Sequence, residues 1–240
     1  MLQLIISLIP FLVILFVLWF KYGKSKNLVN IIFWGSFSTI LSMLLNLPLQ
    51  SIRIFHDNSF LAFLVTAGLI EELTRLYCTK FSKPQSKNDL IYNCFLVSAV
   101  FTSIEDYCYF KEVTDGIKNW LLRALSPMHL FFALLMVILL CKAIDYSKTN
   151  KKKANVYKVL AFVIPVYCHG LWDYSLLQVT SLDSLYKRLL FSPILCYLLP
   201  IIYILVKVKP NENNEVIKVN IWKKLIMIIY GLFVLLGFHV

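Results

Sequence analysis

The feature that most constrains this chain is a series of long apolar runs joined by short polar loops. A helix needs about 20 mostly apolar residues to cross a bilayer. Hydrophobic residues make up 59% of the chain and charged residues only 15%, whereas soluble domains carry about 25% charged residues. We therefore expect an all-α fold, a polytopic transmembrane helix bundle of about eight spans. The predicted spans are 2–20, 28–49, 59–79, 89–110, 118–143, 157–178, 189–206 and 223–239.

The polar stretches between these runs are too short for a separate soluble domain. Residues 1–240 are therefore expected to form one integral membrane domain. In a soluble protein the net charge of +11 would suggest a nucleic-acid partner. Here the lysines lie in the loops, where such residues orient a membrane protein and contact anionic headgroups. We expect membrane lipids as partners and no nucleic acid.

Lysine-rich loops alternate with nearly neutral loops along the chain. The loop after the first span holds Lys21, Lys24 and Lys26, whereas the next loop balances Arg53 with Asp57. The same alternation continues through the seven loops between the predicted spans. Because cytoplasmic loops are enriched in Lys and Arg, the basic odd-numbered loops are expected to be cytoplasmic. The chain is then a multi-pass protein of the cell membrane with both termini extracytoplasmic.

Apart from residues at the ends of the runs, such as His239, charged and histidine residues inside the apolar runs lie in the third to sixth spans. A charge at mid-membrane costs about 2.5–3.5 kcal/mol on insertion scales, so random tolerance would have scattered such residues. Their concentration predicts a polar centre wrapped by apolar helices. The residues are Glu71, Glu72, Arg75, Glu105, Asp106, Arg123, His129, His169 and Asp173.

Helical spacing predicts contacts within this polar centre. Arg75 follows Glu71 by four residues and Glu72 by three, so it can reach either carboxylate. His169 and Asp173 are four apart and share one helix face.

Depth along the spans predicts where the centre opens. At about 1.5 Å rise per residue, Glu71, His129 and His169 can meet near the midplane, with Glu105 nearer the outer surface. The site is therefore expected to open outward. Pro127 should kink the helix that carries His129, and Arg123 is expected near the outer interface in a structural role.

Four motifs in these spans resemble the PrsW family of intramembrane peptidases, within the wider group that includes the CAAX prenyl endopeptidases. They occur in order over residues 71–173, inside a motif-bearing core of 59–178. The family usually has Lys where Arg75 stands and Asn where Asp106 stands. The motifs are Glu71-Glu72-Leu73-Thr74-Arg75, Phe101-Thr102-Ser103-Ile104-Glu105, Arg123-Ala124-Leu125-Ser126-Pro127-Met128-His129 and His169-Gly170-Leu171-Trp172-Asp173.

The resemblance implies an intramembrane endopeptidase that hydrolyses a peptide bond of a membrane-anchored protein. Single-pass or lipid-anchored membrane proteins are the expected substrates, for example a membrane-bound anti-sigma factor. Either Glu71 or Glu72 is expected to be the general base that activates water. Catalytic roles are expected for Glu71, Glu72, Glu105, His129 and His169, with Arg75 and Asp173 supporting them.

Two versions of the chemistry stay open. In the first, Glu105, His129 and His169 bind zinc, since two histidines, one glutamate and a water form a known catalytic zinc set. In the second, no metal takes part and the histidines hydrogen-bond the oxyanion. The HExxH motif, which would support zinc independently, does not occur.

Two other classes of function are compatible with buried carboxylates and histidines. One is a non-enzymatic immunity or partner-binding protein built on the same scaffold. The other is a proton-coupled carrier, because buried Glu and His residues also suit proton relays. The chain shows no evident internal repeat, which many transporters have.

Overall fold

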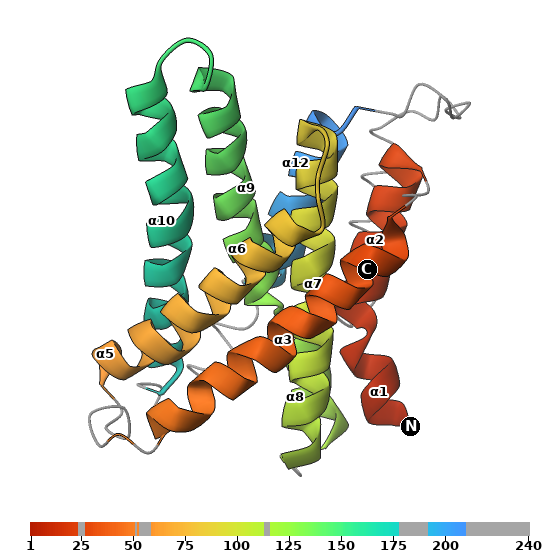
Figure 1. The fold of residues 1–240 in the computed structure, drawn as a ribbon. Helices are drawn as coiled ribbons and strands as arrows, with labels where there is room; N and C mark the ends of the chain where they lie inside the picture. Colours follow the sequence, from red (N-terminus) through yellow and green to blue (C-terminus); the bar gives the residue numbers. More distant parts are fainter. Residues whose placement is uncertain (24–26, 51, 53–58, 113–115, 178–191, 210–240) are drawn as a thin grey trace.

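A computed structural model describes residues 1–23, 27–50, 52, 59–112, 116–177 and 192–209. Within these ranges the regular structure is helical, without strands (Figure 1). Three described helical segments are long and apolar enough to cross a membrane, at Leu28–Leu49, Asn119–Tyr146 and Lys151–Leu176. These findings confirm an all-α membrane helix bundle. The predicted span 223–239 and the first residues of 189–206 lie outside the described ranges.

Most of the described residues lie in helices. Two of them, η1 and η2, are π-helical, closed by hydrogen bonds between residues five apart. The described helices are α1 (Leu2–Ser7), α2 (Ile9–Tyr22), α3 (Leu28–Gln50), α5 (Phe60–Phe63), η1 (Leu64–Glu71), α6 (Glu72–Phe81), α7 (Lys87–Glu112), α8 (Ile117–Ala124), α9 (Met128–Tyr146), α10 (Lys151–Leu177), η2 (Ile194–Leu198) and α12 (Leu199–Lys207).

Prolines divide two of the predicted spans into separate helices. The first span breaks at Leu8, and Pro10 lies in the first turn of α2, where its missing N–H is tolerated. The fifth span breaks between Ala124 and Met128, with Pro127 in a non-helical conformation (φ −75°, ψ 79°). The predicted kink at Pro127 is thus a complete interruption of the helix, and His129 lies in the first turn of α9.

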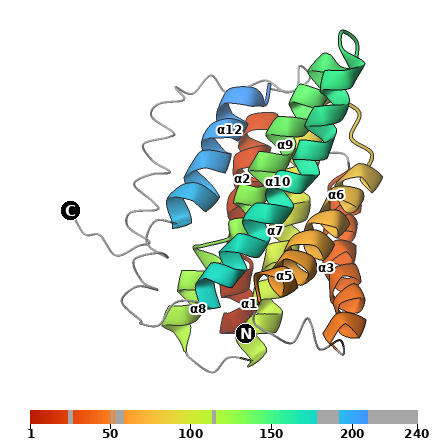
Figure 2. The ribbon, with the colours of Figure 1, turned by 90° about the vertical axis from the view of Figure 1, so that its left-hand side faces the viewer.

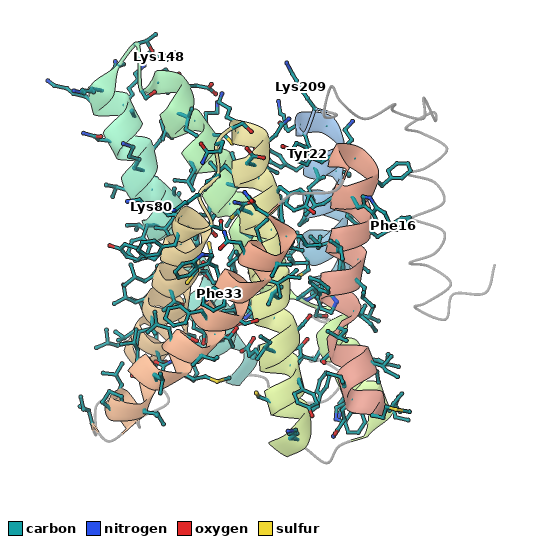
Figure 3. The ribbon with its side chains drawn as sticks, turned by 45° about the vertical axis from the view of Figure 1, so that its right-hand side comes forward. Phe16, Tyr22, Phe33, Lys80, Lys148 and Lys209 are labelled. Atoms are coloured by element: carbon teal, nitrogen blue, oxygen red, sulfur yellow. The ribbon has the colours of Figure 1, made fainter. Side chains whose placement is uncertain are left out.

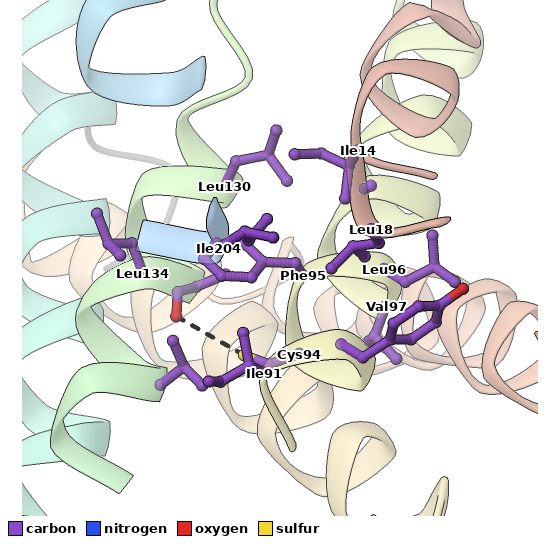
Figure 4. Close-up of a cluster of buried hydrophobic side chains, with 14 of the residues drawn as sticks. Ile14, Leu18, Ile91, Cys94, Phe95, Leu96, Val97, Leu130, Leu134 and Ile204 are labelled. Atoms are coloured by element: carbon purple, nitrogen blue, oxygen red, sulfur yellow. Dashed lines mark hydrogen bonds between the residues drawn. The ribbon is translucent and has the colours of Figure 1, made fainter. Parts of the chain in front are cut away.

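Helix α7 forms the centre of the bundle, and all its residues from Leu90 to Ser103 are buried. Its first half packs in an apolar cluster with residues of α2, α9 and α12 (Figure 4). Cys94 donates a hydrogen bond from Sγ to the carbonyl oxygen of Ala133 at 3.7 Å, which ties α7 to α9 inside this cluster. The apolar cluster is centred on Ile14, Leu18, Ile91, Phe95, Leu96, Val97, Leu130, Leu134 and Ile204.

The described ends of the basic loops gather at one face of the bundle, which we call the basic face. Tyr22 donates to Asp89 Oδ1 at 2.6 Å, and Asn88 donates to the carbonyl oxygen of Lys209 at 3.1 Å. Lys87 forms an ion pair with Asp145. These contacts join the ends of α2, α9 and α12 to the start of α7. Figure 3 shows Tyr22, Lys148 and Lys209 toward the same end of the molecule.

Two segments cross the others at a steep angle. The α3 helix and the continuous α5–η1–α6 segment run diagonally past α7, and α9 and α10 form a long hairpin beside them (Figures 1 and 2). The α5–η1–α6 segment packs against α10 through η1 and contacts α7 through α6. This crossing brings the paired glutamates at the η1–α6 junction to the helices that carry the histidines.

Candidate active site

Three helices place a carboxylate and two imidazoles at one point. Glu71 is the last residue of η1, His129 lies at the start of α9, and His169 lies in α10. Glu71 Oε2 is 3.9 Å from His129 Nε2 and 3.8 Å from His169 Nε2. One ligand atom from each residue lies within 4.8 Å of the other two. Two imidazole nitrogens and a carboxylate oxygen are a donor set for a divalent metal ion.

The hydrogen bonding at this point fits a metal ion. Glu71 Oε2 is buried, and within the described residues it has no hydrogen-bond partner. An unpartnered buried carboxylate oxygen is costly unless a cation satisfies it. Metal–ligand bonds of about 2.0–2.1 Å separate tetrahedral ligand atoms by about 3.3 Å. The two separations from Glu71 Oε2, 3.8 and 3.9 Å, lie close to this value, and all three ligand atoms lie within 4.8 Å of one another.

Glu72 and Arg75 contact both histidines: Glu72 binds the imidazole of His169, and Arg75 binds the backbone of His129. Glu72 Oε1 accepts a hydrogen bond from His169 Nδ1 at 2.9 Å and pairs with Arg75 Nη2. Because an ionised carboxylate only accepts, the proton sits on Nδ1, and Nε2 presents its lone pair toward Glu71. Arg75 Nη1 also donates to the carbonyl oxygen of His129 at 3.0 Å and to Ser98 Oγ at 3.3 Å. Helical spacing allowed Arg75 to pair with either Glu71 or Glu72, and the structure shows the ion pair with Glu72.

Glu105 joins the site from α7. Its Oε2 atom is 2.6 Å from His129 Nε2, and its Oε1 atom is 3.2 Å from Arg123 Nη2. Arg123 also donates from Nε to Asp106 Oδ1 at 2.7 Å and lies over the ring of Tyr109. The sequence predicted a structural role for Arg123 at the outer interface and did not predict this contact with Glu105. Because Arg123 lies on the short helix α8, beyond a loop, no regular sequence spacing could have revealed it.

Asp173 lies on the same side of His169 as Glu71. Its Oδ2 atom is 3.6 Å from His169 Nε2, whereas the opposite ring nitrogen is held by Glu72. Its side chain is 31% exposed, and those of Glu105 and Arg123 are similarly accessible. These three side chains mark the open side of the site.

Aromatic rings fix the orientation of the imidazoles. Phe101 meets His129 edge-on with ring centroids 4.9 Å apart, and Phe132 stacks on His169 at 4.7 Å. The two imidazoles themselves are 4.9 Å apart. Phe101 is therefore a wall of the site as well as the first residue of its motif.

The site lies far from the basic face. Glu105 and His169 are each 18 residues from the first residue of their helices, Lys87 and Lys151. This spacing corresponds to about 27 Å at 1.5 Å rise per residue. A hydrocarbon core is about 30 Å thick, so the site lies nearer the face opposite the basic one than the midplane position that depth along the spans predicted.

Comparison with known proteins identifies relatives that cover this site. The family described as PrsW family intramembrane metalloprotease matches residues 24–206. Protease PrsW of Oceanobacillus iheyensis is 29% identical over 189 residues, which cover 73% of this chain and 81% of that protein. Protease PrsW of Clostridioides difficile (strain 630) is 28% identical over 164 residues, which cover 63% and 67%. No solved structure matches the chain.

Proposed function

Since this chain belongs to the PrsW family of intramembrane metalloproteases, we propose that it cleaves membrane-anchored proteins with a zinc ion held by Glu71, His129 and His169. The observation that carries this proposal is the convergence of the unpartnered Glu71 oxygen with the two Nε2 atoms. When bound, zinc would polarise the scissile carbonyl and activate a water for attack.

The charge of the site supports a bound cation. Among the described residues, five carboxylates gather here around two arginines, Arg75 and Arg123. Buried charges are normally paired or bound to metals, and a divalent ion would offset most of the excess. The carboxylates are those of Glu71, Glu72, Glu105, Asp106 and Asp173.

Glu105 is the general base in this proposal. Glu72 is fully buried and tied to Arg75 and His169, so a water cannot reach it. Glu105 faces the open side of the site, and its side chain is 28% exposed. With a metal bound at His129 Nε2, that nitrogen would no longer hydrogen-bond Glu105. The freed carboxylate takes a proton from the attacking water and delivers it to the leaving amine as the C–N bond breaks.

This assignment exchanges the roles that the sequence suggested for two glutamates. The sequence placed Glu105 among the metal ligands and gave the base to Glu71 or Glu72. The geometry favours Glu71 as the ligand, because its Oε2 atom is nearly equidistant from both Nε2 atoms. Arg123 supports Glu105 by holding its other oxygen.

The substrate is a single-pass or lipid-anchored membrane protein cut near the extracytoplasmic face. The distance of the site from the basic face supports this location, with the basic face cytoplasmic and both termini extracytoplasmic. The family resemblance favours membrane-bound anti-sigma factors as substrates. Such cleavage would release a signalling protein from the membrane.

The test combines cleavage with zinc content in proteoliposomes. Wild type, Glu71→Gln and Glu105→Gln are incubated with a panel of single-pass membrane proteins from the source organism. We expect Glu71→Gln to lose both zinc and cleavage, because it replaces a ligand. Glu105→Gln should keep zinc and lose about 10²–10⁴-fold in rate, the usual contribution of a general base. Asp145→Asn, on the basic face, is the control and should retain both.

The reverse pattern would restore the sequence-based assignment, with Glu105 as ligand and Glu71 as base. A strong chelator should abolish wild-type cleavage, and added zinc should restore it. Full cleavage by a chelated, zinc-free protein would overturn the metal mechanism. Absence of cleavage, together with site variants that still complement a deletion strain, would overturn the peptidase function.

A further inference from the structure

The π-helical segment η1 packs against α10 more tightly than side chains normally allow. The contact is made by Gly68 on η1 and Gly170 on α10, both buried. A Cβ atom built on Gly68 would lie 2.4 Å from the carbonyl oxygen of Val166, and one on Gly170 would lie 2.7 Å from Leu64 Cα. The backbones of η1 and α10 therefore touch directly at two points. Gly68 faces Val166, and Gly170 faces Leu64, about one helical turn away along each helix.

This contact adjoins two of the proposed metal ligands. Gly68 precedes Glu71 by three residues, and Gly170 directly follows His169. The carbonyl oxygen of Gly68 also accepts a hydrogen bond from the backbone N–H of Glu72. A π-helical turn holds one more residue than an α-helical turn, so it shifts the register of the residues that follow. Across this junction both Glu71 and Glu72 face His169.

We infer that Gly68 is a positioning residue: its missing side chain sets the separation between Glu71 on η1 and His169 on α10. Gly68 lies outside the four motifs and nothing in its sequence context singles it out. The inference rests on the proposed function, because it explains how the Glu71 carboxylate is brought within reach of His169 Nε2.

The size of the effect follows from the contact distance. Ordinary van der Waals contact for a Cβ begins at 3.4 Å, against 2.4 Å for a Cβ on Gly68, so an added methyl group must separate the helices by about 1 Å. The opposing atom belongs to the backbone and has no rotamer by which to yield. Metal sites tolerate distance errors of about 0.2 Å, and a misplacement of about 1 Å can cost about 100-fold in rate.

The chain offers a matched control at Gly35 on α3. A Cβ there would lie 2.7 Å from Val100 Cβ and 3.2 Å from the carbonyl oxygen of Val97 on α7. The Gly35→Ala substitution thus adds the same methyl group to another tight helix contact, one that includes none of the proposed ligands. It adds the packing cost at a contact between α3 and α7, away from the contact between η1 and α10.

The experiment compares Gly68→Ala with Gly35→Ala in the full-length protein. Three quantities are measured: zinc affinity by competition with a chromophoric chelator, cleavage in proteoliposomes and thermal stability. We expect Gly68→Ala to lower zinc affinity at least tenfold and kcat by about 100-fold, with little change in KM. Gly35→Ala should lower thermal stability by a similar amount while zinc affinity and kcat stay within about threefold. A Gly68→Val variant should be worse than Gly68→Ala.

The outcomes separate this inference from the proposed function. If Gly68→Ala and Gly35→Ala have equal zinc affinity and kcat, Gly68 does not position the site and the inference is overturned, while the metal assignment stands. If wild type binds no zinc, the metal assignment fails, and the kcat ratio of the two variants alone decides the inference. A ratio near one then overturns it, and a selective loss in Gly68→Ala supports it.

Discussion

The two halves of α7 lie in opposite environments. From Leu90 to Val97 the helix packs in the apolar cluster against α2, α9 and α12. From Ser98 to Asp106 it lines the polar centre, where Ser98 accepts from Arg75 and Glu105 contacts His129. The apolar half is specified by size and shape, which tolerate volume-conserving exchange. The polar half is specified by particular partners, and a half-satisfied network is costly. The two halves should therefore respond to substitution in different quantities, stability in one and metal binding and rate in the other.

Removing an imidazole should give the largest effect. His169→Ala deletes a proposed ligand that is also held by Glu72. Loss of one transition-state donor costs about 10²–10³-fold in kcat, and loss of a metal ligand removes more, so cleavage should fall beyond about 10³-fold. Zinc content and single-turnover cleavage measure it. Wild-type zinc binding in this variant would mean that His169 is not a ligand.

Breaking the support behind the histidines should give the next largest effect. Arg75→Met leaves Glu72 charged and buried, and breaking such a pair costs about 3–5 kcal/mol. Loss of an outer-shell partner should also lower zinc affinity about 10–100-fold. Arg75→Lys keeps the positive charge beside Glu72. It should recover most of the zinc affinity. Equal losses in both variants would show that the guanidinium geometry, and not its charge, is what the site requires.

A cavity in the apolar cluster should lower stability without changing the chemistry. Phe95 is fully buried in α7, and Phe→Ala in a packed core costs about 3–5 kcal/mol. We expect Phe95→Ala to unfold at a lower temperature, with zinc affinity and kcat of the folded fraction near wild type. A selective loss of zinc affinity would indicate that the two halves of α7 are coupled.

An ion pair on the basic face should matter least. Lys87 and Asp145 are 41% and 59% exposed, and exposed pairs contribute about 0–1 kcal/mol. Lys87→Ala should change thermal stability by no more than this and leave cleavage unchanged. A larger loss would indicate that the basic face holds the helices together more strongly than its exposure suggests.

The sequence predicted the helices well because apolar length alone determines which segments can lie in a bilayer. It predicted continuous spans, however, where the structure has breaks at Leu8 and around Pro127. Proline signalled the second break, but a kink and a full interruption share the same local sequence. The π-helical turn Leu64–Glu71 had no recognised sequence signal, because its register is set by packing against α10.

The sequence singled out residues that lie together in the structure, but it did not determine how they pair. All four motifs converge, yet helical spacing left Arg75 free to choose between Glu71 and Glu72. Which glutamate pairs with Arg75 depends on the register of η1 and on His129. The carbonyl oxygen of His129 accepts a hydrogen bond from the second guanidinium nitrogen, Nη1. Likewise, helical spacing brought Asp173 to His169, but it did not reveal that Glu72 holds Nδ1 from another helix. Contacts between helices depend on tilt and crossing, which spacing within one helix does not encode.

The placement of α12 gives the molecule a definite order of completion during synthesis. Every proposed site residue lies between Glu71 and Asp173, so all of them leave the ribosome before α12 begins at Leu199. The apolar cluster is incomplete until Ile201 and Ile204 are synthesised, because both pack in the same cluster as Ile14 of α2. A nascent chain that ends after α10 therefore contains all the proposed site residues but only part of the apolar cluster. Maturation of the enzyme would then be timed by the late docking of α12 beside α2, near the start of the chain.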